Sequence, residues 1–440
     1  MKKRCFVIAL AALLVACSSN KELASKGIDT SDNIVYNDFF TGNTMRFDFH
    51  HAGNSNEENY FFDKVIREGE WAGSEVSLIN PFDYGEQHFR IIDSATGRLI
   101  YKNNYCTLFN EWQTTPEATM TVRSFPESVV FPEPKQDFTI EIYARNKTSK
   151  VWEKKYTQNV DVDDYNIQPG KKPYESVDIH IGGTIAHSLD IVLLPDGFTA
   201  AEKDKFLASC LMWSNALFKY SPFTENRHRI NIRAVWAPSN EKGIDKPGIG
   251  KWVDNLLDTR FYTFNSERYQ MTEEFQKVRD VAACAPYESI FILTNTDKYG
   301  GGGIYNFYGL GSAGETGLTG EVYVHEFGHS LMGLGDEYIE IGNTVSALYP
   351  AGKEPWEPNL TRFVDFNGKW ENMIEEGTPV PTTIENGSKP EDWKIGAYEG
   401  GGYLEKGIYR GWPECMMKAL TEFCPVCQKA ISRYLDYICK

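Results

Sequence analysis

Residues 321–338 read EVYVHEFGHSLMGLGDEY and carry the strongest structural signal in the chain. At their centre is a His-Glu-x-x-His pattern made by His325, Glu326 and His329. Residues four apart project from the same face of an α-helix, so both imidazoles can reach one metal ion. The pattern therefore predicts a helix that presents His325 and His329 to Zn²⁺.

Glu326 stands beside the first histidine, where its carboxylate can reach a water molecule bound to the metal. Zinc lowers the pKa of such a water from 15.7 to about 7, which makes it a nucleophile near neutral pH. Glu326 would accept a proton from this water and later deliver it to a leaving amine. The prediction is a zinc metalloendopeptidase that hydrolyses peptide bonds in extracellular or host proteins.

A third protein ligand is expected, because a catalytic zinc usually has three. No histidine follows His329, so this ligand is a carboxylate or an upstream histidine such as His228. Glycines after the helix let the backbone turn back toward the metal. Asp336 is the predicted ligand and Glu337 the second choice, although either acid could instead orient a histidine. A glutamate from residues 354–376 is a weaker alternative.

Strand signals dominate residues 41–165. Apolar and polar side chains alternate at residues 45–50 and 138–145, which is typical of half-buried antiparallel strands. Residues 88–101 indicate a hairpin around a turn at residues 93–98. We predict an all-β domain, a sandwich, that serves for spacing or recognition.

Residues 166–175 belong to a polar stretch with a Pro-Gly pair and are the predicted linker. From there to residue 440 the pattern alternates between strands and helices, which predicts a mixed α/β catalytic domain over residues 176–440. The expected strands are 189–194, 230–236 and 289–294, and the expected helices are 199–217 and 266–283. The predicted fold class is therefore α+β with two domains.

The N-terminal residues predict a signal peptide for export. Residues 1–17, MKKRCFVIALAALLVAC, combine a positive start with a short apolar run that ends at Cys17. This ending resembles the lipobox of bacterial lipoproteins, so residues 1–16 are a predicted signal peptide and Cys17 a predicted lipid anchor to the membrane. Residues 17–40 would form a tether, and the protein would lie in the bacterial cell envelope. A conventional signal peptide with an incidental cysteine is the alternative.

The composition is that of an ordinary globular protein, with 41% hydrophobic and 24% charged residues. The formal net charge of −16 argues against a nucleic-acid partner, because phosphate binding needs a basic face. The sequence leaves the oligomeric state open.

The motif also carries a family resemblance. Residues 325–338 look like the signature of the IgA peptidase family of metallopeptidases, which are metzincin-like. Residues 190–199, DIVLLPDGFT, resemble that family's opening strand and turn. The family has an all-β N-terminal domain as well, which fits residues 41–165 at the level of architecture. In the commoner metzincin pattern the third ligand follows the second histidine by six residues, whereas Asp336 follows it by seven.

The resemblance implies three further features. Metzincins have a methionine beneath the metal, and Met416 or Met417 is the counterpart here. Their edge strand above the zinc binds extended substrate, a role that residues 300–310 would take. Tyr338 would donate a hydrogen bond to the oxyanion of the tetrahedral intermediate, although a merely packed tyrosine is an equal alternative.

Seven cysteines remain beyond Cys5 and Cys17, and three of them form a pattern near the end of the chain. Cys424 and Cys427 make a Cys-x-x-Cys pair close to Cys415. In an exported protein we expect a disulfide from Cys415 to Cys424 or Cys427, which would pin the methionine turn.

A competing interpretation is a surface binding lipoprotein, an adhesin or glycan-binding protein with a non-catalytic metal site. The intact Glu326 speaks against it, because a structural metal site has no use for a base.

Overall fold

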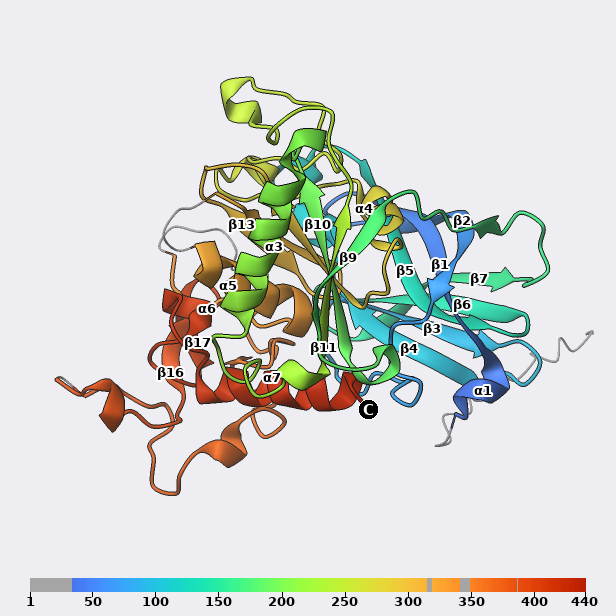
Figure 1. The fold of residues 1–440 in the computed structure, drawn as a ribbon. Coiled ribbons are helices and arrows are strands. Elements are labelled where there is room, and N and C mark those ends of the chain that lie inside the picture. Colours follow the sequence, from blue (N-terminus) through green and yellow to red (C-terminus); the bar gives the residue numbers. More distant parts are fainter. Residues whose placement is uncertain (1–33, 315–318, 341–348, 386) are drawn as a thin grey trace, which may run out of the picture.

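The computed structural model describes residues 34–314, 319–340, 349–385 and 387–440, and its first part is all-β. Two four-stranded sheets, ordered β5-β1-β2-β8 and β4-β3-β6-β7, lie together (Figure 1). The elements are α1 (Tyr36–Phe39), β1 (Phe40–Gly53), β2 (Glu58–Glu70), β3 (Gln87–Asp93), β4 (Leu99–Tyr105), α2 (Leu108–Trp112), β5 (Arg123–Pro134), β6 (Phe138–Arg145), β7 (Trp152–Val160) and β8 (Gln168–Pro169).

Alternating apolar residues close this pair of sheets around one core. Met45, Phe47 and Phe49 of β1 are fully buried there, together with Ile140 and Ile142 of β6. The period-two pattern in the sequence thus corresponds to inward-facing side chains of two antiparallel layers, as in a β-sandwich.

The structure corrects both ends of this region. Tyr36 and Phe40, which the sequence placed in the tether of residues 17–40, are buried in the core because their aromatic rings pack against each other. The predicted linker of residues 166–175 also contains a strand, since β8 pairs in parallel with β2. The backbone amide of Gly170 donates to the carbonyl of Arg67 at 2.6 Å.

A six-stranded sheet with the order β13-β14-β12-β10-β11-β9 forms the second part. Its four inner strands are parallel, and the two edge strands run antiparallel to them. The elements are β9 (Glu175–Ile181), β10 (Leu189–Asp196), α3 (Lys203–Leu217), β11 (Ile230–Trp236), α4 (Phe275–Ala282), β12 (Ser289–Thr294), β13 (Gly301–Ile304), β14 (Tyr308–Ser312) and α5 (Thr319–Met332).

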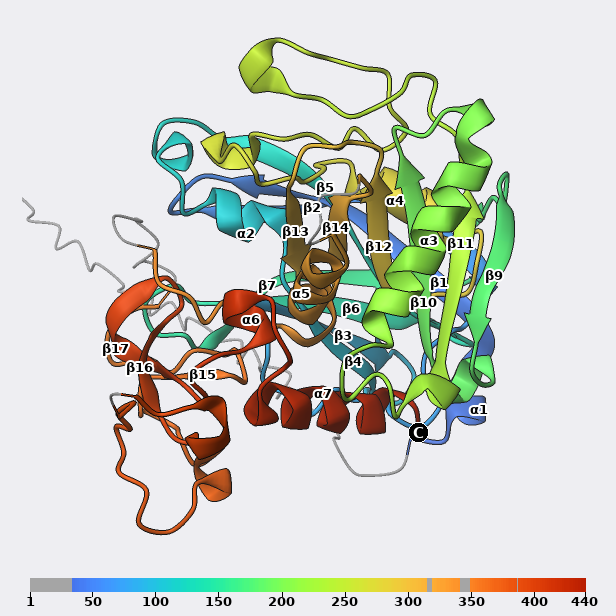
Figure 2. The same cartoon turned by 60° about the vertical axis from the view of Figure 1, so that its left-hand side comes forward.

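The central strand β10 is buried on both sides, which explains its unbroken apolar run. Ile191 and Leu193 face the core that contains α3 and α5. Val192 and Leu194 face the opposite core, which contains α4. Figure 2 shows α3 and α5 in front of the sheet and α4 behind it.

The predicted helix of residues 199–217 is confirmed, with a capping box between Thr199 and Glu202 at its start. The helix predicted over residues 266–283 is too long, because α4 begins only at Phe275. Before it, Met271 forms an antiparallel bridge with Arg260, and such pairing needs extended backbone.

A small three-stranded sheet and two helices complete the chain. The sheet has the order β15-β17-β16, and α7 runs beside α5 (Figure 1). The elements are β15 (Leu360–Thr361), β16 (Tyr398–Gly401), β17 (Leu404–Arg410), α6 (Met416–Ala419) and α7 (Pro425–Ile438). The α+β class predicted from the sequence is confirmed by these sheets and helices.

The β-sandwich packs against α4, which covers one face of the six-stranded sheet. Phe109 and Trp112 of α2 share one buried cluster with Val192 of β10 and Val278 of α4. An ion pair of 2.7 Å between Arg46 and Asp280 joins the same two regions. The two regions therefore share a buried interface.

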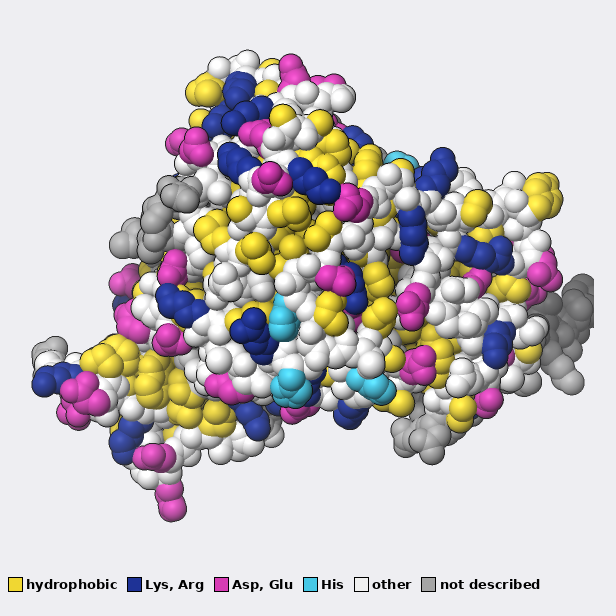
Figure 3. Space-filling model, in the orientation of Figure 1, with side chains coloured by type: hydrophobic (Ala, Val, Ile, Leu, Met, Phe, Trp, Pro, Cys, Tyr) yellow, Lys and Arg dark blue, Asp and Glu magenta, His cyan; other side chains and the backbone are white. Residues whose placement is uncertain are grey.

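The predicted signal peptide, residues 1–16, and Cys17 lie outside the described residues. Among the helices that are described, none has the length and apolar character needed to cross a bilayer. On the face shown in Figure 3, basic and acidic side chains are interspersed.

Candidate metal centre

Helix α5 holds the His-Glu-x-x-His pattern, and the glycines of β13 let it lie close to the sheet. A Cβ atom on Gly303 would clash with the carbonyl oxygen of Glu326 and stand 3.0 Å from the Cβ of His329. A Cβ on Gly301 would stand 2.9 Å from the Glu326 carboxylate. Glycines at positions 301 and 303 are thus a requirement of this contact.

Two backbone carbonyls orient the histidine rings. The Nδ1 of His325 lies 3.0 Å from the carbonyl oxygen of Met416, and the Nδ1 of His329 lies 2.6 Å from that of Leu334. A carbonyl only accepts hydrogen bonds, so each Nδ1 carries a proton, and the neutral form of each ring has its lone pair on Nε2. Both Nε2 atoms are therefore prepared to bind a metal ion.

These nitrogens and one carboxylate oxygen form a small triangle. The two Nε2 atoms are 3.1 Å apart, and the Oδ1 of Asp336 lies 3.2 Å from that of His325 and 3.3 Å from that of His329. Zinc bonds of about 2.0–2.2 Å to nitrogen and oxygen give tetrahedral ligand spacings of about 3.3–3.6 Å. The three atoms are spaced as ligands of one ion.

Asp336 has a buried carboxylate oxygen that a bound cation would stabilise. Its side chain is 5% exposed, and Oδ1 has no hydrogen-bond partner among the described residues, while Oδ2 accepts from Tyr403. Burial raises the pKa of Asp336, but the neighbouring histidine charges outweigh burial and hold it well below its usual range. The carboxylate and the two Nε2 atoms fit a divalent ion such as zinc.

Glu326 lies beside this triangle without being part of it. Its carboxylate is within 4.8 Å of ligand atoms of both histidines, and the three side chains are half-buried. Burial raises the pKa of Glu326 above its usual value, although the histidine charges oppose this shift. The position suits a group that exchanges protons with a water molecule at the centre.

The other candidates for the third ligand do not lie at the two histidines. Glu337 accepts a hydrogen bond of 2.9 Å from Asn359, on the opposite side of the loop from the histidines. His228 is exposed and contacts the carbonyl of Glu225. In residues 354–376, Glu354 pairs with Lys369, and Glu357 accepts from Tyr349. Of these, the structure brings only Asp336 to the two histidines.

Two tyrosines face the centre, and the sequence pointed to only one of them. Tyr338 is half-buried, and burial with the charges of Asp336 and Glu326 raises its pKa. Tyr403 packs edge-on against it at 5.2 Å between ring centroids and donates to Asp336. Tyr403 lies 67 residues from Asp336, so local sequence carries no signal of this contact beyond the turn-forming glycines before it.

Met417 packs against helix α5 at Gly328. A Cβ on Gly328 would stand 3.0 Å from the Met417 sulfur. Met416 contributes the carbonyl that orients His325. The two neighbouring residues thus support the metal-binding helix in different ways.

The β-sandwich region reaches the centre through α2, which sequence reasoning missed. The hydroxyl of Tyr269 donates to the carboxylate of Glu111 on α2. Burial raises the pKa of Glu111 to about 7, and the charges of His329 and Glu326 act on it. This region therefore adds an acidic group to the wall of the site.

The predicted disulfide from Cys415 to Cys424 or Cys427 is not present in the structure, where the Sγ atoms of Cys415 and Cys427 are 3.7 Å apart. A disulfide bond measures about 2.05 Å. All seven cysteines in the described part of the chain are free: Cys106, Cys210, Cys284, Cys415, Cys424, Cys427 and Cys439.

Two imidazoles and a carboxylate around one point, with a second carboxylate beside them, are the components of a metal-dependent hydrolase centre. The model of the family IgA Peptidase M64 matches residues 177–391 and 386–435, and that of the Peptidase M64 N-terminus matches residues 35–157. The chain belongs to the IgA peptidase M64 family of metallopeptidases, which confirms the resemblance seen in the sequence. No curated protein matches the chain.

Proposed function

We propose that this protein is a zinc-dependent endopeptidase of metzincin-like architecture. The observation that carries the proposal is the triangle of His325, His329 and Asp336, whose ligand atoms lie 3.1–3.3 Å apart. The third of these atoms, the buried Oδ1 of Asp336, has no hydrogen-bond partner among the described residues. Membership of a peptidase family supports protein or peptide substrates. A binding protein with a non-catalytic metal site is not favoured.

His325, His329 and Asp336 would hold the zinc ion. When bound, zinc supplies a Lewis acid that makes water nucleophilic near neutral pH. Glu326 takes the proton of the attacking water and passes it to the leaving amine. Tyr338, on the loop after Asp336, donates a hydrogen bond to the oxygen of the scissile carbonyl as charge develops there.

Extended substrate would bind along β13, the edge strand next to the centre. Part of this edge is already used, since the amide of Gln270 donates to the carbonyl of Gly301 at 3.3 Å. Backbone pairing with substrate is therefore expected beyond Gly301, toward Ile304, where main-chain hydrogen bonds give affinity with little dependence on side chains.

The test is cleavage of a diverse peptide library, read by mass spectrometry, beside zinc content. Wild type should cut peptides and bind zinc, and removal of the metal by a chelator should abolish cleavage. Glu326→Gln should keep the zinc and lose the cleavage. Zinc binding without cleavage of any peptide or folded protein by wild type would contradict the peptidase proposal.

For location, we propose that Cys17 is lipidated and holds the protein in the bacterial cell envelope. The chain should incorporate a labelled fatty acid in a bacterial host and partition with membranes. Cys17→Ser should lose the label and appear in the soluble fraction. Equal labelling of both forms would overturn the anchor.

A further inference from the structure

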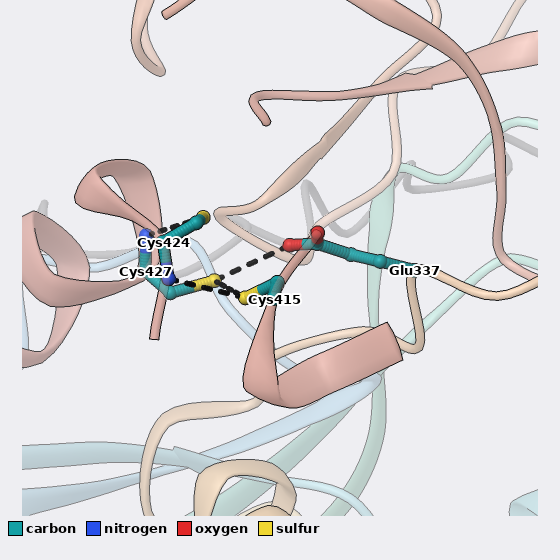
Figure 4. Close-up of side chains that lie close together, drawn as sticks. All are labelled: Glu337, Cys415, Cys424 and Cys427. Atoms are coloured by element: carbon teal, nitrogen blue, oxygen red, sulfur yellow. Dashed lines mark hydrogen bonds between the residues drawn. The ribbon is translucent and has the colours of Figure 1, made fainter. Parts of the chain in front are cut away.

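Three cysteines and a glutamate lie close together in the fold: Cys415, Cys424, Cys427 and Glu337 (Figure 4). Cys415 precedes α6, Cys424 caps the start of α7, and Cys427 lies in the first turn of α7. Glu337 follows Asp336 directly. One ligand atom from each of the four residues lies within 4.8 Å of the others, and each side chain is at most 3% exposed.

The spacing of these atoms is that of metal ligands. The Sγ atoms of Cys415 and Cys427 are 3.7 Å apart, and the Sγ of Cys427 lies 3.3 Å from the Oε1 of Glu337. Zinc–sulfur bonds of about 2.3 Å give tetrahedral sulfur–sulfur spacings of about 3.8 Å. The pair is too far apart for a disulfide and at the right distance to share an ion.

Glu337 supplies a second and independent observation. Its side chain is 0% exposed, and its Oε2 has no hydrogen-bond partner among the described residues. Burying an unpaired carboxylate is costly. A disulfide between two of the cysteines would leave this oxygen and the third thiol without partners, whereas a cation would bind all four groups.

Backbone amides point at two of the three sulfur atoms. The amide of Cys424 donates to the Cys415 sulfur at 3.3 Å, and the amide of Cys427 donates to the Cys424 sulfur at 3.5 Å, at the N-terminus of α7. The buried guanidinium of Arg410 adds a positive charge that acts on Glu337 and Cys415.

We propose that Cys415, Cys424, Cys427 and Glu337 bind a second metal ion, Zn²⁺, in a closed structural site distinct from the histidine centre. Four protein ligands with no open position are typical of structural zinc. Three sulfur ligands favour zinc over magnesium or calcium, which prefer oxygen. The site does not depend on whether the histidine centre is catalytic.

Such an ion would stabilise two segments that contact the histidine centre. Glu337 adjoins Asp336, and its amide donates to the carbonyl of Met417 at 2.8 Å. Cys415 adjoins Met416, whose carbonyl orients His325. One ion would thus fix both the loop with the carboxylate ligand and the segment beneath the helix.

The test is spectroscopy of the full chain loaded with Co²⁺ in place of zinc. Two ions per chain are expected, with a thiolate-to-cobalt charge-transfer band that a site of nitrogen and oxygen ligands does not give. Absence of this band in wild type, or a disulfide among the three cysteines found by peptide mapping of the metal-loaded protein, would overturn the proposal.

Variants separate the two centres. His325→Ala with His329→Ala should lose one ion and keep the band, even if the peptidase proposal fails. Cys424→Ser with Cys427→Ser should lose the band and one ion. Cys210→Ser, which removes an equally buried thiol at 0% exposure, is the matched control and should keep two ions and the band. A band that survives the double cysteine substitution would contradict the assignment.

Discussion

At the scale of single residues, the centre combines ligands with groups that hold them in place. His325 and His329 are oriented by carbonyls of residues that follow the helix, and Asp336 is held by Tyr403. Glu326 stands beside the ligands, so its chemistry can be removed without removing the metal. Substitutions can therefore separate metal binding from catalysis.

Glu326→Gln should lower kcat/KM by about 100- to 10,000-fold, because the amide keeps the size of the side chain but cannot accept the proton. Zinc content should stay at the wild-type level. Kinetics on one cleaved peptide and metal analysis of the same preparation give both values. A variant with full activity would remove Glu326 from the mechanism.

Tyr403→Phe should weaken zinc binding by about 10- to 100-fold, because the hydroxyl that supports Asp336 is lost. Its neighbour offers the comparison: Tyr338→Phe should keep the zinc affinity and lower kcat by about 100-fold or more, the typical cost of losing one oxyanion donor. Zinc competition with a fluorescent chelator and steady-state kinetics measure the two effects. Equal behaviour of both variants would show that the assigned roles are wrong.

At the scale of elements, α5 and β13 approach so closely that only glycine fits between them. The sequence has four consecutive glycines at residues 300–303, and the reason for those at 301 and 303 becomes visible only when the helix is in place. The approach of the two elements sets the position of both histidines relative to the sheet edge.

Gly303→Ala should destabilise the protein by about 1–3 kcal/mol, because the new methyl group would clash with the backbone of α5. Zinc affinity should fall with it, since the helix must shift. Gly368→Ala is the control, because its Cβ would meet only the Asp365 side chain at ordinary distances of 3.5 Å or more. Urea unfolding and zinc titration of both variants test this, and equal stability would contradict the contact.

At the scale of the whole molecule, the β-sandwich and the six-stranded sheet behave as one packed body. Arg46 is 1% exposed and donates to Asp48, Glu68 and Asp280, the last of which belongs to α4. Glu111 on α2 connects the first region with the metal centre, because the charges of His329 and Glu326 act on it. The first region thus packs against the second and also contributes a side chain to the wall of the metal centre.

Arg46→Met should cost about 3–5 kcal/mol of unfolding free energy, because the buried Asp48 and Glu68 both lose the guanidinium group that pairs with them. Asp280→Asn should cost about 1 kcal/mol or less, since that side chain is 62% exposed. Urea denaturation of the two variants gives the comparison. A small loss for Arg46→Met would mean that the carboxylates find other partners.

The metal-binding helix, the strand pattern of both regions and the family could all be predicted from the sequence alone. These features depend on local periodicity, in which residues four apart share a helix face and alternate residues share a strand face. Three others were decided only in the folded chain: that the first choice Asp336, and not Glu337, meets the histidines, that Tyr403 and Glu111 join the site, and that the cysteines gather around Glu337. Asp336 and Glu337 are adjacent and chemically alike, and they point to opposite sides of one loop. That choice rests on packing between segments far apart in the chain, which no local pattern encodes.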